Sequence, residues 1–270
     1  MPELPEVETT RLGLYPLVKE KKITNVVVRQ RSLRWPIEIG FEDHLLGSVF
    51  TRLSRRGKYL LFHSKNGKMM VHLGMSGSLR MVSSRSNPRK HDHVDICFEN
   101  SSVLRYHDPR RFGSFFWLAP KEIHSLLKDL GPEPLSKKFD GNYLYEMAKR
   151  RKVAVKTLIM NSSVVVGVGN IYANESLFLS GIRPDRLASS ISKKRYNSLV
   201  AQIKRVLNSS IRSGGTTLRD FVREDGQPGY FKQRLFVYGR GNMHCKNCEK
   251  SLKETRINNR STFFCSSCQT

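Results

Sequence analysis

Two closely spaced pairs of cysteines near the C-terminal end restrict the fold more than any other feature of this sequence. Cys245 and Cys248 form the first pair, and Cys265 and Cys268 form the second after sixteen intervening residues. This spacing is typical of a four-cysteine zinc site, in which two turns each supply a thiolate pair to one tetrahedral ion. Because four thiolates leave no open coordination position, the expected zinc ion is structural. The adjacent His244 is then surplus, and the alternative is four free surface thiols.

The charge balance predicts the kind of partner. The chain carries 47 Lys and Arg against 23 Asp and Glu, a formal net charge of +24. Such an excess favours association with a polyanion, and a nucleic acid is the expected partner. An anionic membrane would need an anchor, yet no apolar run approaches the roughly 20 residues of a spanning helix. The start of the chain carries Glu3, Glu6 and Glu8, unlike a signal peptide, so a cytoplasmic location is expected.

The pattern of apolar residues predicts an α+β chain of several domains. A helix is expected over 5–18, where Pro5 and two glutamates suit the first turn. It precedes short segments rich in β-branched and aromatic residues, which indicate a β-sandwich or barrel. Cys97 lies in one of these apolar segments and is expected in the core. The predicted strands are 23–29, 57–63, 69–73, 93–98 and 103–106.

The second half of the chain has a helical period. The Gly-Pro-Glu-Pro run at 131–134 suits neither a strand nor a helix, and we expect a domain boundary there. A polar, glycine- and proline-punctuated stretch at 216–230 is expected to be a long functional or mobile loop. The predicted helices are 143–149, 153–160, 171–179 and 193–211.

The N-terminus offers an unusual nucleophile. If Met1 is removed, Pro2 presents a secondary amine with an expected pKa of about 7.7, well below the value of about 10.4 for a lysine. Attack of such an amine on a sugar C1′ gives an iminium ion, and the adjacent Glu3 carboxylate could move protons. From the residues alone, a plain N-terminal extension remains the alternative.

The N-terminal and cysteine motifs, together with six internal motifs, resemble those of the formamidopyrimidine-DNA glycosylase (Fpg, MutM) family of bacterial base-excision repair enzymes. The resemblance covers the whole chain, and its motifs occur in order. The internal motifs lie at 55–60, 72–77, 90–95, 108–113, 166–173 and 237–240.

The resemblance implies a role for particular residues. Pro2 would be the Schiff-base nucleophile, Glu3 its acid–base partner and Lys58 a proton donor in β-elimination. Arg260 would serve δ-elimination. Three side chains would fill the space left by a flipped base, and three more would contact the DNA backbone. The first set is Met75, Arg110 and Phe112, and the second is His91, Arg151 and Asn170.

The implied activity is that of a bifunctional DNA glycosylase and AP lyase for oxidised purines in duplex DNA, monomeric and with one structural zinc ion. The implied domains are a catalytic β-sandwich at 1–131, a helix-two-turn-helix domain with a lesion loop at 132–230 and a zinc finger at 231–270. Two alternatives stay open: an endonuclease VIII-like enzyme for oxidised pyrimidines, and a non-catalytic zinc-stabilised DNA-binding protein. Leu4 and the Arg110–Phe112 element favour the purine-specific branch, and retention of Pro2, Glu3 and Lys58 favours an enzyme.

Overall fold

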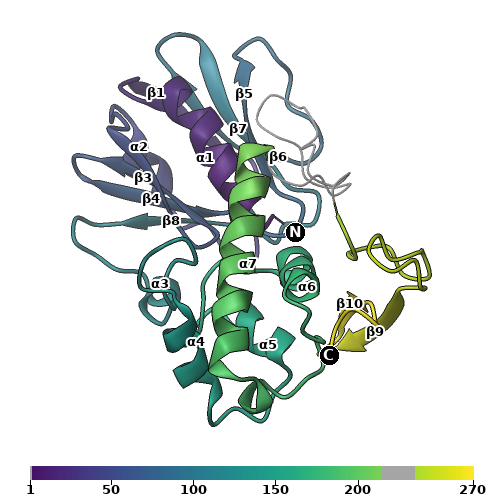
Figure 1. Ribbon diagram of the computed structural model, residues 1–270. Coiled ribbons are helices and arrows are strands. Elements are labelled where there is room, and N and C mark those ends of the chain that lie inside the picture. The colour runs from purple at the N-terminus through teal and green to yellow at the C-terminus, as the bar shows by residue number, and fades with distance from the viewer. Residues whose placement is uncertain (1, 215–234) are drawn as a thin grey trace. The chain divides into compact units, whose positions relative to one another are not determined.

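The computed structural model describes residues 2–214 and 235–270, so the predicted loop at 216–230 lies outside the described residues. The described chain forms two compact units, one built mainly on residues 2–128 and the other on residues 129–212 and 235–270. The first unit begins with a helix and consists mainly of short strands, and helices followed by one β-hairpin make up the second (Figure 1). No helix in these ranges combines the length and apolarity that a membrane span requires.

The first unit is a β-sandwich with a leading helix. One antiparallel sheet has the strand order β1-β6-β7-β5, and the other has the order β2-β3-β4-β8. Helix α1 packs against β2 and β5. The elements are α1 (Leu4–Val18), β1 (Ile23–Val28), α2 (Phe41–Leu45), β2 (Arg52–Arg56), β3 (Tyr59–Ser64), β4 (Gly67–His72), β5 (Ser78–Ser83), β6 (Asp92–Phe98), β7 (Ser102–His107), β8 (Ser114–Leu118) and α3 (Ser125–Lys128).

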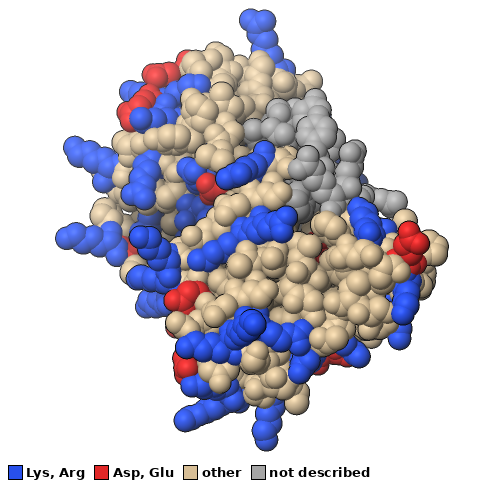
Figure 2. All heavy atoms as spheres, in the orientation of Figure 1, with Lys and Arg blue, Asp and Glu red and all other residues tan. Residues whose placement is uncertain are grey.

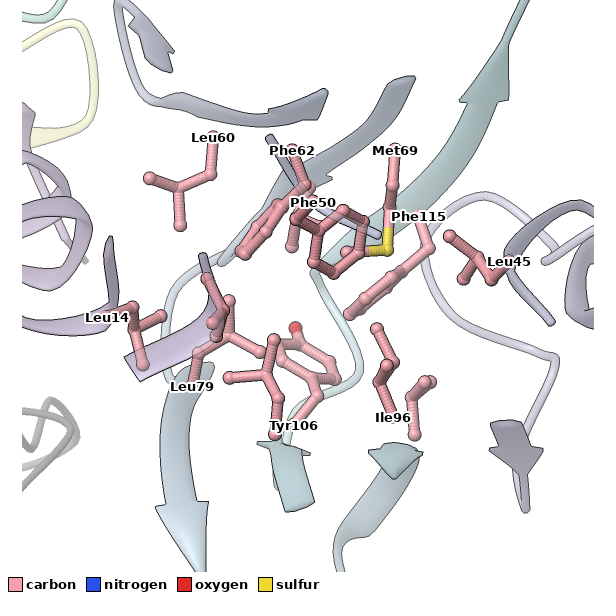
Figure 3. Close-up of a cluster of buried hydrophobic side chains, with 14 of the residues drawn as sticks. Leu14, Leu45, Phe50, Leu60, Phe62, Met69, Leu79, Ile96, Tyr106 and Phe115 are labelled. Atoms are coloured by element: carbon pink, nitrogen blue, oxygen red, sulfur yellow. The ribbon is translucent and has the colours of Figure 1, made fainter. Parts of the chain in front are cut away.

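The core of this unit lies between the two sheets (Figure 3). Phe62 and Phe115 from one sheet approach Tyr106 from the other, and the Tyr106 and Phe115 rings are 4.9 Å apart in an edge-to-face arrangement. Alternate residues of each strand point into this layer, as an antiparallel sheet with one covered face requires. Helix α1 adds Val7 and Leu14 to the same core.

The second unit is helical and ends in a hairpin. Helix α7 buries one apolar face, with Leu199, Ile203 and Leu207 fully covered, and exposes a basic one. Strands β9 and β10 join through Asn258 and Asn259, which both have positive φ angles. The elements are α4 (Gly141–Ala148), α5 (Val155–Met160), α6 (Asn170–Leu179), η1 (Ala188–Ser190), α7 (Lys193–Arg212), β9 (Lys253–Ile257) and β10 (Arg260–Phe264).

The structure confirms the predicted α+β class, the leading helix and the four helices beyond residue 140, with bounds shifted by at most two residues. Five predicted strands correspond to β1, β3, β4, β6 and β7. The prediction missed β2 and β5, which interleave polar residues with apolar ones, and also the largely apolar β8. It was also wrong to start a strand at Gly57, because Gly57 and Lys58 form the turn between β2 and β3.

Candidate functional site

The N-terminal end of α1 carries the predicted nucleophile and its partner. Pro2 is buried, and Glu3 is the N-cap residue of the helix. The Glu3 backbone N–H donates to Glu6 Oε2 at 2.8 Å, and the Glu3 carboxylate accepts from the Glu6 backbone N–H, which completes a reciprocal capping box. Both carboxylates are almost fully buried. The capped first turn of α1 therefore fixes the direction in which the backbone leaves the helix toward Pro2.

Lys58 lies in the two-residue turn that joins β2 and β3, where Arg56 and Tyr59 form the last cross-strand pair. Gly57 has a φ of 57°, a left-handed conformation that glycine adopts without strain. Lys58 is half-buried and stands at the end of a rigid hairpin.

His72, which the sequence analysis did not single out, lies near this turn at the end of β4. Its ring is 4.9 Å from the ring of Tyr59. Burial, together with the positive charges of Lys58 and Arg34, lowers the pKa of His72 to about 4, so the imidazole is neutral at pH 7. The Gly74 N–H donates to His72 Nδ1 at 3.1 Å, which leaves the ring proton on Nε2. Its position in the motif at 72–77 was the only feature of the sequence that could have identified His72 as a candidate.

One buried carboxylate ties together the two loops that carry Met75, Arg110 and Phe112. Asp108 Oδ1 accepts from Ser76 Oγ at 2.7 Å and from the Arg110 N–H at 3.3 Å. Asp108 Oδ2 accepts from Tyr106 Oη and from the Gly113 N–H, each at 2.9 Å. Asp108 is fully buried, so these bonds are made away from water. The turn at 74–76 and the loop at 109–113 are therefore held to one another.

Two glycines let these loops approach one another. A Cβ added to Gly74 would lie 2.4 Å from the Phe112 carbonyl carbon, and one added to Gly113 would lie 1.7 Å from Tyr106 Oη. Neither position has room for a side chain. Met75 lies in the turn at 74–76 and is half-buried.

Arg110 and Phe112 line an open pocket of about 460 Å³ together with Arg34 and Arg111. The Arg110 guanidinium carbon lies 4.8 Å from the centre of the Phe112 ring, a cation–π contact. Phe112 is 39% exposed, so part of its ring is accessible from solvent. Arg34 is a further pocket residue that sequence reasoning missed.

His91 precedes β6, and its carbonyl accepts from the Asp108 N–H at 3.0 Å. Its half-buried ring lies 5.9 Å from the ring of His107 and 6.3 Å from that of His93. The structure therefore groups four predicted site residues of the first unit around Asp108: Met75, His91, Arg110 and Phe112.

Replacement of this carboxylate gives a first prediction. Asp108→Asn turns one acceptor oxygen into a donor that faces existing donors, and we expect the free energy of unfolding to fall by about 3 kcal/mol. The control is Asp140→Asn at the N-cap of α4, where Asp140 accepts from Tyr143 at the surface and asparagine caps equally well. Urea unfolding of both variants measures the difference, and equal losses would contradict the role given to Asp108.

In the second unit, polar contacts attach the hairpin to α6 and α5. Asn170, at the start of α6, donates from Nδ2 to the Ser261 carbonyl at 3.0 Å. Asn174 accepts from the Phe263 N–H at 2.9 Å. Lys156 is 1% exposed, and its Nζ donates to the Ser261 carbonyl at 2.9 Å and to Thr262 Oγ1 at 2.7 Å. Sequence reasoning missed Lys156, because nothing in its local sequence indicates burial.

Glu175 of α6 holds the chain that leads into the cysteine segment. Its carboxylate accepts from the backbone N–H groups of Phe236, Val237 and Tyr238 at 2.8 to 2.9 Å. Burial raises the pKa of Glu175 although these three hydrogen bonds favour the charged form. The motif at 237–240 is therefore anchored by a buried side chain that the sequence analysis did not identify.

The remaining basic candidates of the second unit are at its surface. Arg260 is exposed at the first position of β10, directly after the Asn258–Asn259 turn. Two successive positive φ angles are typical of the type I′ turn, which fixes the register of a hairpin. Arg151 and its neighbours at 149–152 are all exposed, and Lys149 pairs with Glu146 at 2.7 Å.

The four cysteines come together as the spacing predicts. Their sulfur atoms all lie within 4.8 Å of one another. The Sγ atoms of Cys245 and Cys268 are 3.9 Å apart, and those of Cys248 and Cys265 are 3.4 Å apart. A Zn–S distance of about 2.3 Å gives tetrahedral S···S edges of about 3.8 Å. The cluster is thus positioned to bind one metal ion, and its size and all-thiolate composition fit zinc. The prediction that Cys97 lies in the core was wrong: its neighbours Ile96 and Phe98 point into the core, so Cys97 faces the other side of the sheet, where it is half-buried on β6.

Comparison with known proteins places these features in a family. The model of the formamidopyrimidine-DNA glycosylase N-terminal domain matches residues 1–115, and that of the formamidopyrimidine-DNA glycosylase H2TH domain matches residues 130–222. The chain is 56% identical over 271 residues to formamidopyrimidine-DNA glycosylase of Marinomonas sp., with all of both chains covered. It is 52% identical over 270 residues to that of Hydrogenovibrio crunogenus, covering 100% of this chain and 96% of the relative.

Solved structures agree with this assignment. The MutM (Fpg) protein of Thermus thermophilus superposes with a TM-score of 0.89 at 35% identity, covering 99% of this chain and 98% of the other. A Lactococcus lactis Fpg mutant in complex with Fapy-dG containing DNA superposes with a TM-score of 0.92 at 30% identity, with 99% of each chain covered. Taken with the domain matches and the gathered cysteines, these likenesses establish that the chain belongs to the formamidopyrimidine-DNA glycosylase family.

Proposed function

We propose that this protein is a bifunctional DNA glycosylase and AP lyase of base-excision repair that removes oxidised purines from duplex DNA. The observation that carries the proposal is the match over the whole chain to Fpg proteins, among them Lactococcus lactis Fpg bound to Fapy-dG containing DNA and to abasic-site DNA. The net charge of +24 supports a DNA partner, and Lys and Arg far outnumber Asp and Glu on the face shown in Figure 2.

In this proposal the Pro2 amine, freed by removal of Met1, attacks C1′ of the damaged nucleotide. The new C–N bond forms as the bond from C1′ to the base breaks, and the base leaves with a proton. Glu3 moves protons on the sugar and the base. The C1′–O4′ bond of the sugar then breaks, and O4′ takes up a proton as the proline nitrogen becomes an iminium ion. The iminium ion makes the C2′ proton acidic, so loss of this proton and cleavage of the C3′–O bond expel the 3′ phosphate by β-elimination, with Lys58 as proton donor. A δ-elimination, served by Arg260, expels the 5′ phosphate.

The same proposal assigns the DNA-binding side chains. Extruding a base costs a few kcal/mol of stacking, which a thioether, a guanidinium and a ring inserted into the duplex would offset. Met75, Arg110 and Phe112 have these groups, and the shared anchor at Asp108 supports a joint role. Contacts to phosphates are assigned to His91, Arg151 and Asn170. Residues 1–131 would form the catalytic β-sandwich domain, 132–230 the helix-two-turn-helix domain with the lesion loop, and 231–270 the zinc finger.

Zinc is the metal we propose for the cluster of Cys245, Cys248, Cys265 and Cys268. Four thiolates would saturate it, so its contribution is to hold the two cysteine turns together rather than to take part in the reaction. The hydrogen bonds of Lys156 and Asn170 to the Ser261 carbonyl of β10 would then hold the neighbouring Arg260 in place relative to α5 and α6.

Borohydride trapping on two duplexes tests the substrate. An Fpg-type enzyme forms a covalent adduct with DNA that contains 8-oxoguanine opposite cytosine. An endonuclease VIII-like enzyme forms it preferentially with an oxidised thymine, and a non-catalytic binder forms it with neither. We expect at least about tenfold more adduct on the first duplex at equal time. A preference for the oxidised thymine would overturn the purine assignment while leaving the amine chemistry intact.

A further inference from the structure

Arg55 connects helix α1 to the turn that carries Lys58. Its Nε donates to Glu8 Oε2 at 2.8 Å, and its NH1 nitrogen donates to the Gly57 carbonyl at 2.7 Å. The side chain is 10% exposed. A planar guanidinium with several fixed donors is suited to hold a carboxylate and a carbonyl at the same time.

The hydrogen bond from Arg55 to the Gly57 carbonyl affects the peptide group that carries Lys58. The Gly57 carbonyl belongs to the peptide group whose nitrogen is that of Lys58. A hydrogen bond to this oxygen restrains the plane of that peptide, from which the Lys58 Cα departs. Gly57 has no side chain and a positive φ, so the strands alone restrain this peptide less than they would at another residue.

Glu8, which accepts the other hydrogen bond from Arg55, belongs to the helix that begins beside Pro2. Glu8 lies five residues after Glu3 on the same helix, roughly 7.5 Å along its axis. Burial alone would raise the pKa of Glu8, yet its hydrogen bonds and charge interactions with Arg11 and Arg55 lower it, so Glu8 is ionised at neutral pH. Arg55 therefore links the Lys58 turn to the rigid element that begins beside Pro2.

We propose that Arg55 is a positioning residue, which sets the place of the Lys58 ammonium relative to the Pro2 end of α1 and thereby supports the elimination step. This inference rests on the proposed function of Lys58. Arg55 does not take part in the chemistry itself and acts through the orientation of the Gly57–Lys58 peptide.

Arg11 provides a matched control. Its Nε and NH2 groups also bind Glu8, at 2.7 to 3.1 Å, but its NH1 nitrogen donates to the Leu53 carbonyl rather than to the turn. Arg55→Gln and Arg11→Gln thus each remove one guanidinium from Glu8, and only the first removes the bond to Gly57. We expect similar falls in melting temperature for the two variants.

The test is single-turnover strand cleavage of a duplex with one abasic site, followed alongside borohydride trapping of the imine. We expect Arg55→Gln to slow cleavage at least tenfold while imine formation changes less than twofold. Arg11→Gln should change both less than twofold. Arg55→Lys keeps the positive charge beside Glu8 but can bind only one of the two acceptors, so it should also slow cleavage. This second variant keeps the test decisive if Arg55→Gln folds poorly.

A double variant separates this inference from the function on which it rests. In a Lys58→Ala background, Arg55→Gln should slow cleavage less than twofold further, because the group that it positions is gone. A full additional loss would show that Arg55 acts independently of Lys58 and would overturn the inference. Wild-type cleavage by Lys58→Ala alone would instead refute the proposed role of Lys58. Equal deficits in Arg55→Gln and Arg11→Gln would assign Arg55 to general stability.

Discussion

Keeping the Pro2 nitrogen in a peptide bond should reduce adduct formation on lesion-containing DNA by on the order of 1,000-fold or more. An amide nitrogen shares its lone pair with the carbonyl and is not a nucleophile, whereas a free secondary amine is one. A version of the chain with one residue that cannot be trimmed before Pro2 tests this. The measurement is the yield of the borohydride-trapped covalent complex on a duplex with 8-oxoguanine opposite cytosine.

The matched control carries a protease-cleavable leader that ends at Pro2. Before cleavage it should be as inactive as the blocked form, and after cleavage it should recover the full yield. Affinity for an undamaged duplex should differ by less than about twofold among the forms, since the residues proposed to contact phosphates are unchanged. Normal trapping by the blocked form, or a sugar remnant found by mass spectrometry on a residue other than Pro2, would refute the amine mechanism.

Cys265→Ser should release the metal and weaken DNA binding by on the order of 100-fold, because the free energy of binding a structural zinc is used for local folding. Cys265 is fully buried and packs with Phe263 and Leu252 in a small core next to the other three cysteines. Without the ion, the hairpin that carries Arg260 would lose the crosslink between its two ends. Elemental analysis of the purified protein should give one zinc per chain for the wild type and close to none for the variant.

Cys97→Ser is the control, because Cys97 belongs to β6 of the first unit and is not one of the four cysteines whose sulfur atoms come together. It should keep its zinc and its affinity for DNA. Retention of one zinc per chain by Cys265→Ser would contradict the proposed ligand set. Zinc loss without any change in affinity would show that the metal has no part in DNA binding.

The sequence predicted the helices well and the strands only in part. Helix α7 has an apolar stripe at the helical period, and this local signal suffices. Strand β2 (Arg-Leu-Ser-Arg-Arg) has one buried residue, Leu53, and its polar side chains are used at the surface and against α1. Its identity as a strand depends on pairing with β3, which a short local pattern does not reveal.

The candidate site shows the same division. The four cysteines were predicted from spacing alone, because the chemistry of one ion requires that spacing. Asp108, Lys156 and Glu175 were not predicted, although each is buried and anchors a segment that carries candidate residues. A charged side chain usually lies at the surface, and only the tertiary structure shows which ones are surrounded by hydrogen-bond partners.

The shared anchor at Asp108 has a consequence for motion. Met75 and Phe112 belong to different loops, yet both loops end in bonds to the same carboxylate. If one loop moved outward alone, a buried oxygen of Asp108 would lose its hydrogen-bond donor. The motion with the lowest free-energy cost therefore displaces both loops together. If Met75 and Phe112 insert into DNA as proposed, we therefore expect them to enter and leave the duplex together rather than one after the other.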